Sequence, residues 1–181
     1  DTTYYVNDTS GSLTQVVAEI DQDGKETASY IRGDELLSME RDGRIWYYIY
    51  DGHGNTRLLT NAAGTVTDRY DYDACGNLLQ KEGETENDFL YTGEQYNANT
   101  GLYYLRARYM DPSTGTFISM DSYQGSLYDP VSLHKYLYAN ANPVKYTDPT
   151  GYFSLAECSA ANSIQSELNS YQTVWLMNVY R

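Results

Sequence analysis

Apolar and polar residues alternate along the first 82 residues of the chain. In residues 65–72, for example, Val66, Tyr70 and Tyr72 occupy alternate positions, with threonine, arginine and aspartate between them. A period of two, rich in tyrosine, threonine and valine, favours β-strands with one covered face. The pattern therefore predicts short strands joined by turns over residues 1–82.

A turn signal recurs in register with these strands. A tyrosine followed shortly by Asp-x-x-Gly occurs three times, with the aspartates at Asp8, Asp51 and Asp73. Asp51 and Asp73 are 22 positions apart, and Asp8 and Asp51 are 43 apart, which predicts a degenerate copy around residues 29–33. Aspartate caps such a turn through its own backbone, and glycine takes the left-handed position. Each unit is a β-hairpin that cannot bury its face alone, so neighbouring units must stack.

The high tyrosine content of the chain indicates a particular kind of sheet. The chain of 181 residues has 21 tyrosines but only three phenylalanines and two tryptophans. A tyrosine ring packs on one side while its hydroxyl reaches a polar partner, which suits a thin, curved sheet. A carbohydrate-binding surface is the alternative, because sugar rings also stack on tyrosine. The net charge of −13 disfavours nucleic acid as a partner, and no apolar run is long enough to span a membrane.

The repeats resemble the YD repeats of the rearrangement-hotspot (RHS) proteins. Residues 70–78, Tyr-Asp-Tyr-Asp-Ala-Cys-Gly-Asn-Leu, carry the resemblance most clearly. The resemblance implies a mainly β fold in which antiparallel hairpins form a curved shell segment. It also implies a secreted or cell-surface bacterial protein, whose partners are the remaining repeats of the shell and a C-terminal cargo.

A second block of motifs resembles the RHS-associated core domain, which closes the shell at its C-terminal end. Its elements follow in the family's order, at residues 89–96, 100–112, 114–121, 133–144 and 148–151. We therefore expect three parts: hairpin repeats over residues 1–82, a small mixed α/β core plug over 83–152, and a helical tail or toxin linker over 153–181. Within the plug, Leu102, Tyr104 and Ala107 are expected to be buried, and residues 131–138 to form a short helix after Pro130.

In many bacterial relatives this core is a self-cleaving aspartyl protease, with one aspartate in each of two Asp-Pro-x-Gly motifs. Asp148 lies in an intact motif, whereas Asp121 lacks the following proline. The resemblance therefore makes Asp121 and Asp148 the catalytic candidates, and the bond between Tyr152 and Phe153 the candidate scissile bond. The chemistry needs two carboxylates that share one proton.

Several features leave alternatives open. In one alternative, a nearby arginine, Arg106 or Arg108, holds one aspartate ionised. In another, both aspartates only cap turns. At most, the chain is a single-turnover aspartyl autoprotease. A carbohydrate- or partner-binding module at the cell surface is the alternative function.

Cofactor and metal sites are not expected. Asp71, Asp73 and Glu82 nearly match a calcium loop, but Cys75 occupies a position that requires an oxygen ligand. A disulfide between Cys75 and Cys158 is left open by the sequence. A capping-box sequence at residues 154–157 and apolar residues at helical spacing predict a C-terminal helix.

Overall fold

The computed structural model describes residues 2–11, 13–125, 127–128, 130–152 and 155–156. Eight strands between Tyr4 and Glu82 form one antiparallel sheet, in which each strand pairs with the next along the chain. We call this sheet the wall. Its strands are β1 (Tyr4–Asp8), β2 (Gln15–Ile20), β3 (Glu26–Arg32), β4 (Leu36–Arg41), β5 (Arg44–Tyr50), β6 (Thr56–Asn61), β7 (Val66–Tyr72) and β8 (Leu78–Glu82).

The Asp-x-x-Gly turns at Asp51 and Asp73 form as predicted, whereas Gly11, in the turn after Asp8, does not take the left-handed conformation. The Asp51 carboxylate accepts hydrogen bonds from the backbone N–H groups of His53 and Asn55, at 2.9 and 3.0 Å. Gly54 has a φ of +79°, the left-handed conformation that glycine adopts without steric cost. The turn around Asp73 repeats the same bonds. These turns and the β3–β4 turn at residues 33–35, where the degenerate copy was predicted, lie along one edge of the wall.

One face of the wall is covered and the other is exposed. Tyr30 pairs across strands with Met39, and Tyr48 pairs with Leu59; all four side chains are buried. Large residues on the opposite face remain exposed, including Ile31, Tyr47 and Ile49. Burying one large apolar side chain contributes about 1.5–3 kcal/mol, so the covered face supplies most of the stability of the wall.

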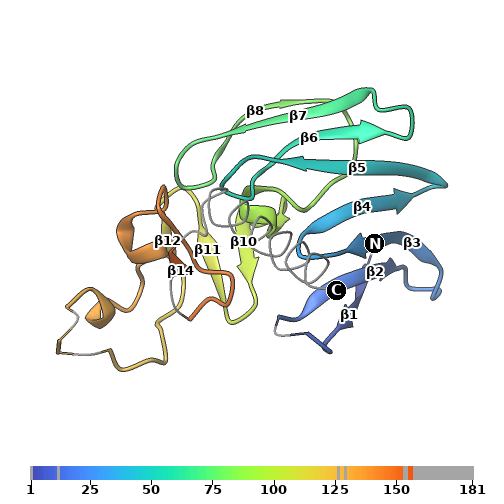
Figure 1. Ribbon diagram of the computed structural model, residues 1–181. Coiled ribbons are helices and arrows are strands. Elements are labelled where there is room, and N and C mark those ends of the chain that lie inside the picture. The colour runs from blue at the N-terminus through green and yellow to red at the C-terminus, as the bar shows by residue number, and fades with distance from the viewer. Residues whose placement is uncertain (1, 12, 126, 129, 153–154, 157–181) are drawn as a thin grey trace, which may run out of the picture.

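The covered face packs against a smaller unit, which we call the plug (Figure 1). A second sheet, in the order β12-β11-β10-β9, forms its centre. The elements of the plug are the 3₁₀ turn η1 (Tyr91–Gly93), β9 (Gln95–Asn97), β10 (Leu102–Leu105), β11 (Arg108–Asp111), β12 (Thr116–Phe117), η2 (Pro130–Leu133), η3 (Ala139–Ala141), and the pair β13 (Tyr146–Thr147) and β14 (Leu155–Ala156). Figure 1 shows the wall arching over this unit.

Hydrogen bonds from the wall turns hold the plug in place. The side-chain oxygen of Asn55 accepts from the Thr92 N–H at 2.9 Å. In the corresponding turn, the Asn77 amide donates to the Pro112 carbonyl at 2.7 Å. The Tyr103 hydroxyl donates to the Gly76 carbonyl at 2.9 Å. In the Asp51 and Asp73 turns, the residue after the glycine is therefore a docking point for the plug.

Some expectations for the plug were wrong. Tyr103 and Leu105 are buried, whereas Tyr104 and Ala107 are exposed and Leu102 is only half-buried, because the run forms a strand with a period of two. Among the described residues of the plug the helices are all 3₁₀ turns, so its expected mixed α/β character is not found.

The expected helix over residues 131–138 is also wrong. It is limited to η2, because Tyr136 and Leu137 make backbone contacts with β12 instead.

The start of the expected C-terminal helix is wrong as well. Leu155 and Ala156 form β14, which pairs with β13 in place of a first helical turn. The rest of that helix, and Cys158 with its open pairing to Cys75, lie outside the described residues. No helix in the described part of the chain is long and apolar enough to cross a membrane.

The contact between the wall turns and the plug can be tested at a single glycine. A Cβ atom at Gly76 would lie 2.6 Å from the Tyr91 ring, whereas one at Gly64, on the opposite edge, would meet nothing within 4 Å. Both glycines have positive φ, so each alanine variant carries the same backbone strain of about 1–2 kcal/mol. We expect Gly76→Ala to cost about 1–3 kcal/mol more than Gly64→Ala in urea unfolding, from overpacking. Equal losses would show that the close packing of Tyr91 on the wall contributes nothing.

Candidate functional site

Asp148 lies in the turn that follows β13. Its Oδ1 atom accepts from the Gly151 N–H at 2.8 Å, the Thr150 hydroxyl at 3.1 Å and the Tyr152 N–H at 3.2 Å. The residue is only 2% exposed. One carboxylate oxygen therefore orders the Asp148–Gly151 turn, while the other faces Arg108.

Arg108, at the start of β11, is the centre of the candidate site. Its Nη2 atom lies 2.9 Å from Asp121 Oδ2 and 3.5 Å from Asp148 Oδ2. The guanidinium stacks over the Phe117 ring, with 3.6 Å between Cζ and the ring centroid. Burial lowers the pKa of Arg108, and the two aspartates oppose that shift. A cation–π contact and two ion pairs thus hold one buried cation.

Asp121 lies a few residues after β12 and contacts the same Arg108 atom. Its N–H donates to the Lys135 carbonyl at 2.9 Å, and its Oδ1 accepts from the Tyr123 N–H at 2.8 Å. Since Asp121 and Asp148 each place an oxygen near the same Nη2 atom, those oxygens lie at most about 6.4 Å apart, the sum of the two distances. Three of the residues singled out from the sequence are therefore brought together, across 40 positions of the chain.

Arg106 does not join this group. Its Nη1 atom contacts both carboxylate oxygens of Glu94 at 2.9 Å and also donates to the Pro149 carbonyl. Its Nε donates to the Thr14 carbonyl of the wall at 3.1 Å. Of the two arginines proposed to support the aspartates, only Arg108 contacts them.

Glu94 is the residue that sequence reasoning missed. It is 8% exposed, and burial raises its pKa while Arg106 opposes that shift. The available signal was an acidic residue directly after the Tyr-Thr-Gly of residues 91–93, in a segment rich in aromatic residues. A buried carboxylate requires a charged partner, which that signal would have led us to seek.

The arrangement limits what the aspartates can do. Aspartyl protease chemistry needs two carboxyl groups that act together on water and the peptide bond, whereas here both contact the same cation. Arg108 therefore has to move away from one carboxylate before the pair can act on a peptide bond. Tyr152 is exposed, and Phe153 lies outside the described residues.

The other candidate sites have less support as ligand-binding or catalytic sites. Asp73 is committed to its own turn and Asp71 pairs with Arg57, so neither carboxylate is arranged as a calcium ligand. No group of three or more potential metal ligands occurs in the described part of the chain. The thiol of Cys75 is half-buried beside Gly115, and burial raises its pKa.

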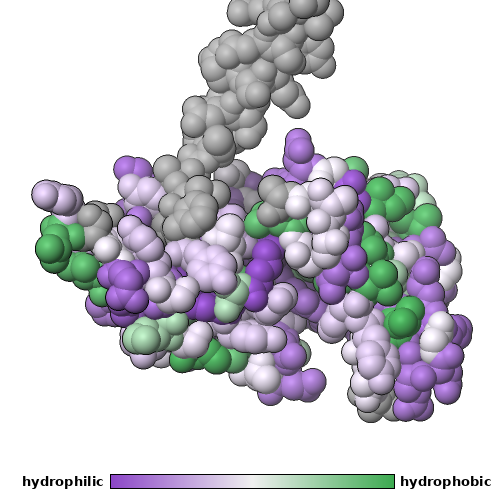
Figure 2. All heavy atoms as spheres, turned by 90° about the horizontal axis from the view of Figure 1, so that it is seen from below, coloured by the Kyte–Doolittle hydropathy of each residue, from purple (hydrophilic) through white to green (hydrophobic). Residues whose placement is uncertain are grey.

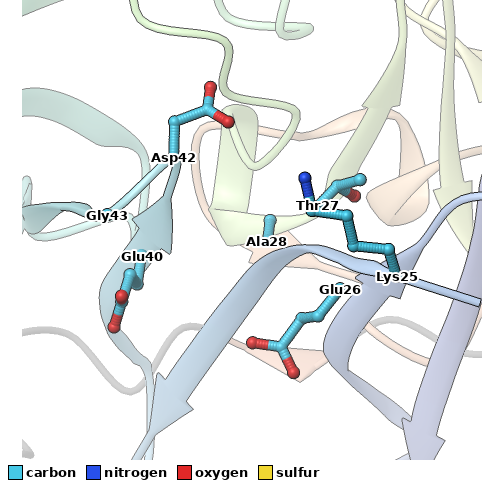
Figure 3. A pocket seen from close by; sticks show the side chains of 7 residues that line it. All are labelled: Lys25, Glu26, Thr27, Ala28, Glu40, Asp42 and Gly43. Atoms are coloured by element: carbon cyan, nitrogen blue, oxygen red, sulfur yellow. The ribbon is translucent and has the colours of Figure 1, made fainter.

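An open hollow lies between the start of β3 and the β4–β5 turn (Figure 3). It is lined by Lys25, Glu26, Thr27, Ala28, Glu40, Asp42 and Gly43. The side chain of Asp42 points away from those of Glu26 and Glu40, so the three carboxylates do not converge on the hollow.

The fold and the site together define a hairpin-repeat wall closed by a plug around a buried arginine–aspartate cluster. A model of the Teneurin YD-shell family matches residues 5–144, and the chain belongs to this family. This confirms the resemblance to RHS and YD-repeat proteins.

Relatives extend the comparison. The chain is 40% identical over 148 residues to the tRNA3(Ser)-specific nuclease WapA of Bacillus spizizenii, a match that covers 79% of the chain and 6% of that protein. It is 32% identical over 165 residues to salivary gland surface protein 1 of Aedes aegypti, covering 84% of the chain and 5% of the relative. The chain thus spans only a small fraction of the length of these two relatives.

A solved structure supports the same fold. The crystal structure of TcdB2-TccC3-Cdc42 superposes with a TM-score of 0.62 over 83% of this chain and 8% of the solved chain. At 18% sequence identity, this likeness is one of fold.

Removal of the central cation gives a direct test of the cluster. We expect Arg108→Gln to lower the free energy of unfolding by about 3–5 kcal/mol, because it leaves the buried Asp148 and the half-buried Asp121 without their counter-charge. Adding Asp121→Asn and Asp148→Asn should recover part of the loss by removing the like charges. The matched control is Arg57→Gln, in an exposed pair with Asp71, which should cost less than about 1 kcal/mol. Equal losses in Arg108→Gln and Arg57→Gln, measured by urea unfolding, would contradict a central role for Arg108.

Proposed function

We propose that this chain is the C-terminal wall and plug segment of a secreted or cell-surface bacterial shell protein that encloses a C-terminal cargo. The observation that carries the proposal is the fixed seating of the plug on the covered face of the wall, through Asn55, Asn77 and Tyr103. A plug held in this way closes one end of a curved sheet.

The size of the relatives agrees with this role. The chain matches 6% of the length of each of two Bacillus WapA proteins, whose names describe nucleases that act on tRNA. An acidic segment of −13 net charge is a poor surface for tRNA, so we assign any such activity to cargo outside this segment. A relative named as a surface protein supports an extracellular location.

Encapsulation can be tested in the full-length protein that carries this segment. A specific protease site placed in the expected cargo, after Arg181, should be protected while the plug is seated. Tyr91→Ala, which removes a buried ring from the wall–plug contact, should expose the site and raise its rate of cutting by about tenfold or more.

Tyr47→Ala, a truncation on the exposed face of the wall, is the control and should leave the site protected. Equal cutting in the native protein and in Tyr91→Ala would refute encapsulation.

A single-turnover aspartyl autoprotease is the second candidate activity. It is supported by the approach of Asp121 and Asp148 to the same Arg108 atom, and by the 3.2 Å distance from Asp148 Oδ1 to the Tyr152 N–H. An ionised carboxylate would take a proton from water as the water oxygen attacks the Tyr152 carbonyl carbon. The protonated partner would donate to the leaving nitrogen of Phe153 as the peptide bond breaks.

Autoproteolysis is tested by intact mass, in a chain extended past Arg181. We expect a break after Tyr152 that is abolished by Asp121→Asn or Asp148→Asn, because the reaction needs both carboxyl groups. Asp111→Asn is the control, since Asp111 also precedes a proline but only caps an exposed turn. A chain that stays intact would rule out the activity.

Carbohydrate binding has weaker support. The hydroxyls of Tyr30, Tyr48 and Tyr72 are bonded within the protein, to Glu19, Asn87 and the Thr56 carbonyl. The rings of Tyr30 and Tyr48 are buried against the plug and that of Tyr72 is partly buried, so a sugar would have to bind exposed tyrosines such as Tyr47.

A further inference from the structure

Three consecutive residues of the β10–β11 hairpin bind three consecutive carbonyl groups of the Asp148–Gly151 turn. Arg106 Nη1 donates to the Pro149 carbonyl, and the Ala107 N–H donates to the Thr150 carbonyl at 3.3 Å. Arg108 Nε donates to the Gly151 carbonyl. We call the residues 106–108 the cradle. It fixes the backbone up to the residue immediately before Tyr152.

Close packing reinforces these bonds. A Cβ atom at Gly151 would lie 2.4 Å from the Leu105 carbonyl oxygen and 3.0 Å from the Arg108 nitrogen. The turn can therefore approach the hairpin only with a glycine at this position. Gly151 also has a φ of +71°, so both its backbone conformation and its close packing favour glycine at this position.

Glu94 holds the first member of the cradle. Arg106 sits in a two-residue turn with a φ of +60°, a conformation that costs a non-glycine residue about 1–2 kcal/mol. Both carboxylate oxygens of Glu94 lie 2.9 Å from Arg106 Nη1. The same guanidinium reaches the Thr14 carbonyl of the β1–β2 turn and the Pro149 carbonyl. Without Glu94, a half-buried cation would have only carbonyl partners.

We propose that Glu94 is a positioning residue: through Arg106, it fixes the backbone of residues 149–151 and thereby the place of the Tyr152 carbonyl relative to Asp148. Glu94 touches neither aspartate in this scheme and acts only through the cradle. The consequence for cleavage rests on the autoprotease activity proposed above. The ordering of residues 149–152 by Glu94 does not depend on that activity.

The ordering is tested first, by hydrogen exchange on the 181-residue chain. We expect Glu94→Gln to speed exchange of the amides of Ala107, Gly151 and Tyr152 by about tenfold, while amides of β5 and β6 keep their wild-type rates. The control is Glu82→Gln, which removes an exposed carboxylate paired with Arg69 and should change none of these amides.

A second variant guards against a folding defect in the first. Arg106→Lys keeps the positive charge, but a single ammonium group cannot replace the planar guanidinium that contacts Glu94, Pro149 and Thr14 together. It should produce the same local increase in exchange. Wild-type rates at Ala107, Gly151 and Tyr152 in both variants would overturn the proposal, as would an equal increase throughout the wall in both.

Cleavage provides a readout that a purely structural role would not move. In the chain extended past Arg181, we expect Glu94→Gln to slow the break after Tyr152 by about tenfold or to shift it to a neighbouring bond, seen as a change in product mass. Unchanged rate and unchanged product mass would overturn the positioning role. If the wild-type chain is never cut, the autoprotease proposal fails, and the exchange result alone decides whether Glu94 orders the segment.

Discussion

The structure depends on covering one face of a sheet that is a single layer thick. The hairpins of the wall place Tyr30, Tyr48 and Tyr70 on that face, and their burial requires a second layer. The plug supplies it, and the two units share one continuous core. Since a hairpin alone cannot bury its apolar face, neither the curvature nor the stability of the wall is a property of the repeats alone.

The docking of the plug uses atoms that the hairpin turns already present. Asn55 and Asn77 each bind the aspartate of their own turn and also reach the plug. One residue type therefore serves both local turn formation and tertiary contact. The exposed lower surface of the molecule, in contrast, is mainly hydrophilic with scattered apolar areas (Figure 2). At the wall–plug junction, by comparison, the polar side chains of Asn55 and Asn77 help to hold the two units together.

Acidic groups concentrate near this junction. Glu19, which is buried, accepts from the Tyr30 hydroxyl and pairs with Arg41 at 2.9 Å. Burial and the charge of Glu19 raise the pKa of Asp88 to about 6, while Arg41 opposes the shift. Arg41 forms ion pairs with Glu19 and Glu86. In the candidate site, Arg108 likewise forms ion pairs with Asp121 and Asp148, so in each case one cation compensates more than one carboxylate. Arginine suits this role because its planar guanidinium offers several donors at once.

The sequence by itself determined the hairpin units, their Asp-x-x-Gly turns, the family, and the identity of Asp121, Asp148 and Arg108 as residues worth finding together. These follow from local rules of alternation and turn chemistry and from ordered motifs. Only the tertiary structure decided which arginine contacts the aspartates, because Arg106 and Arg108 lie two positions apart on the same hairpin and the sequence does not show which partners their side chains reach. It also revealed Glu94 and the cradle, since both depend on contacts between segments 12 to 43 positions apart.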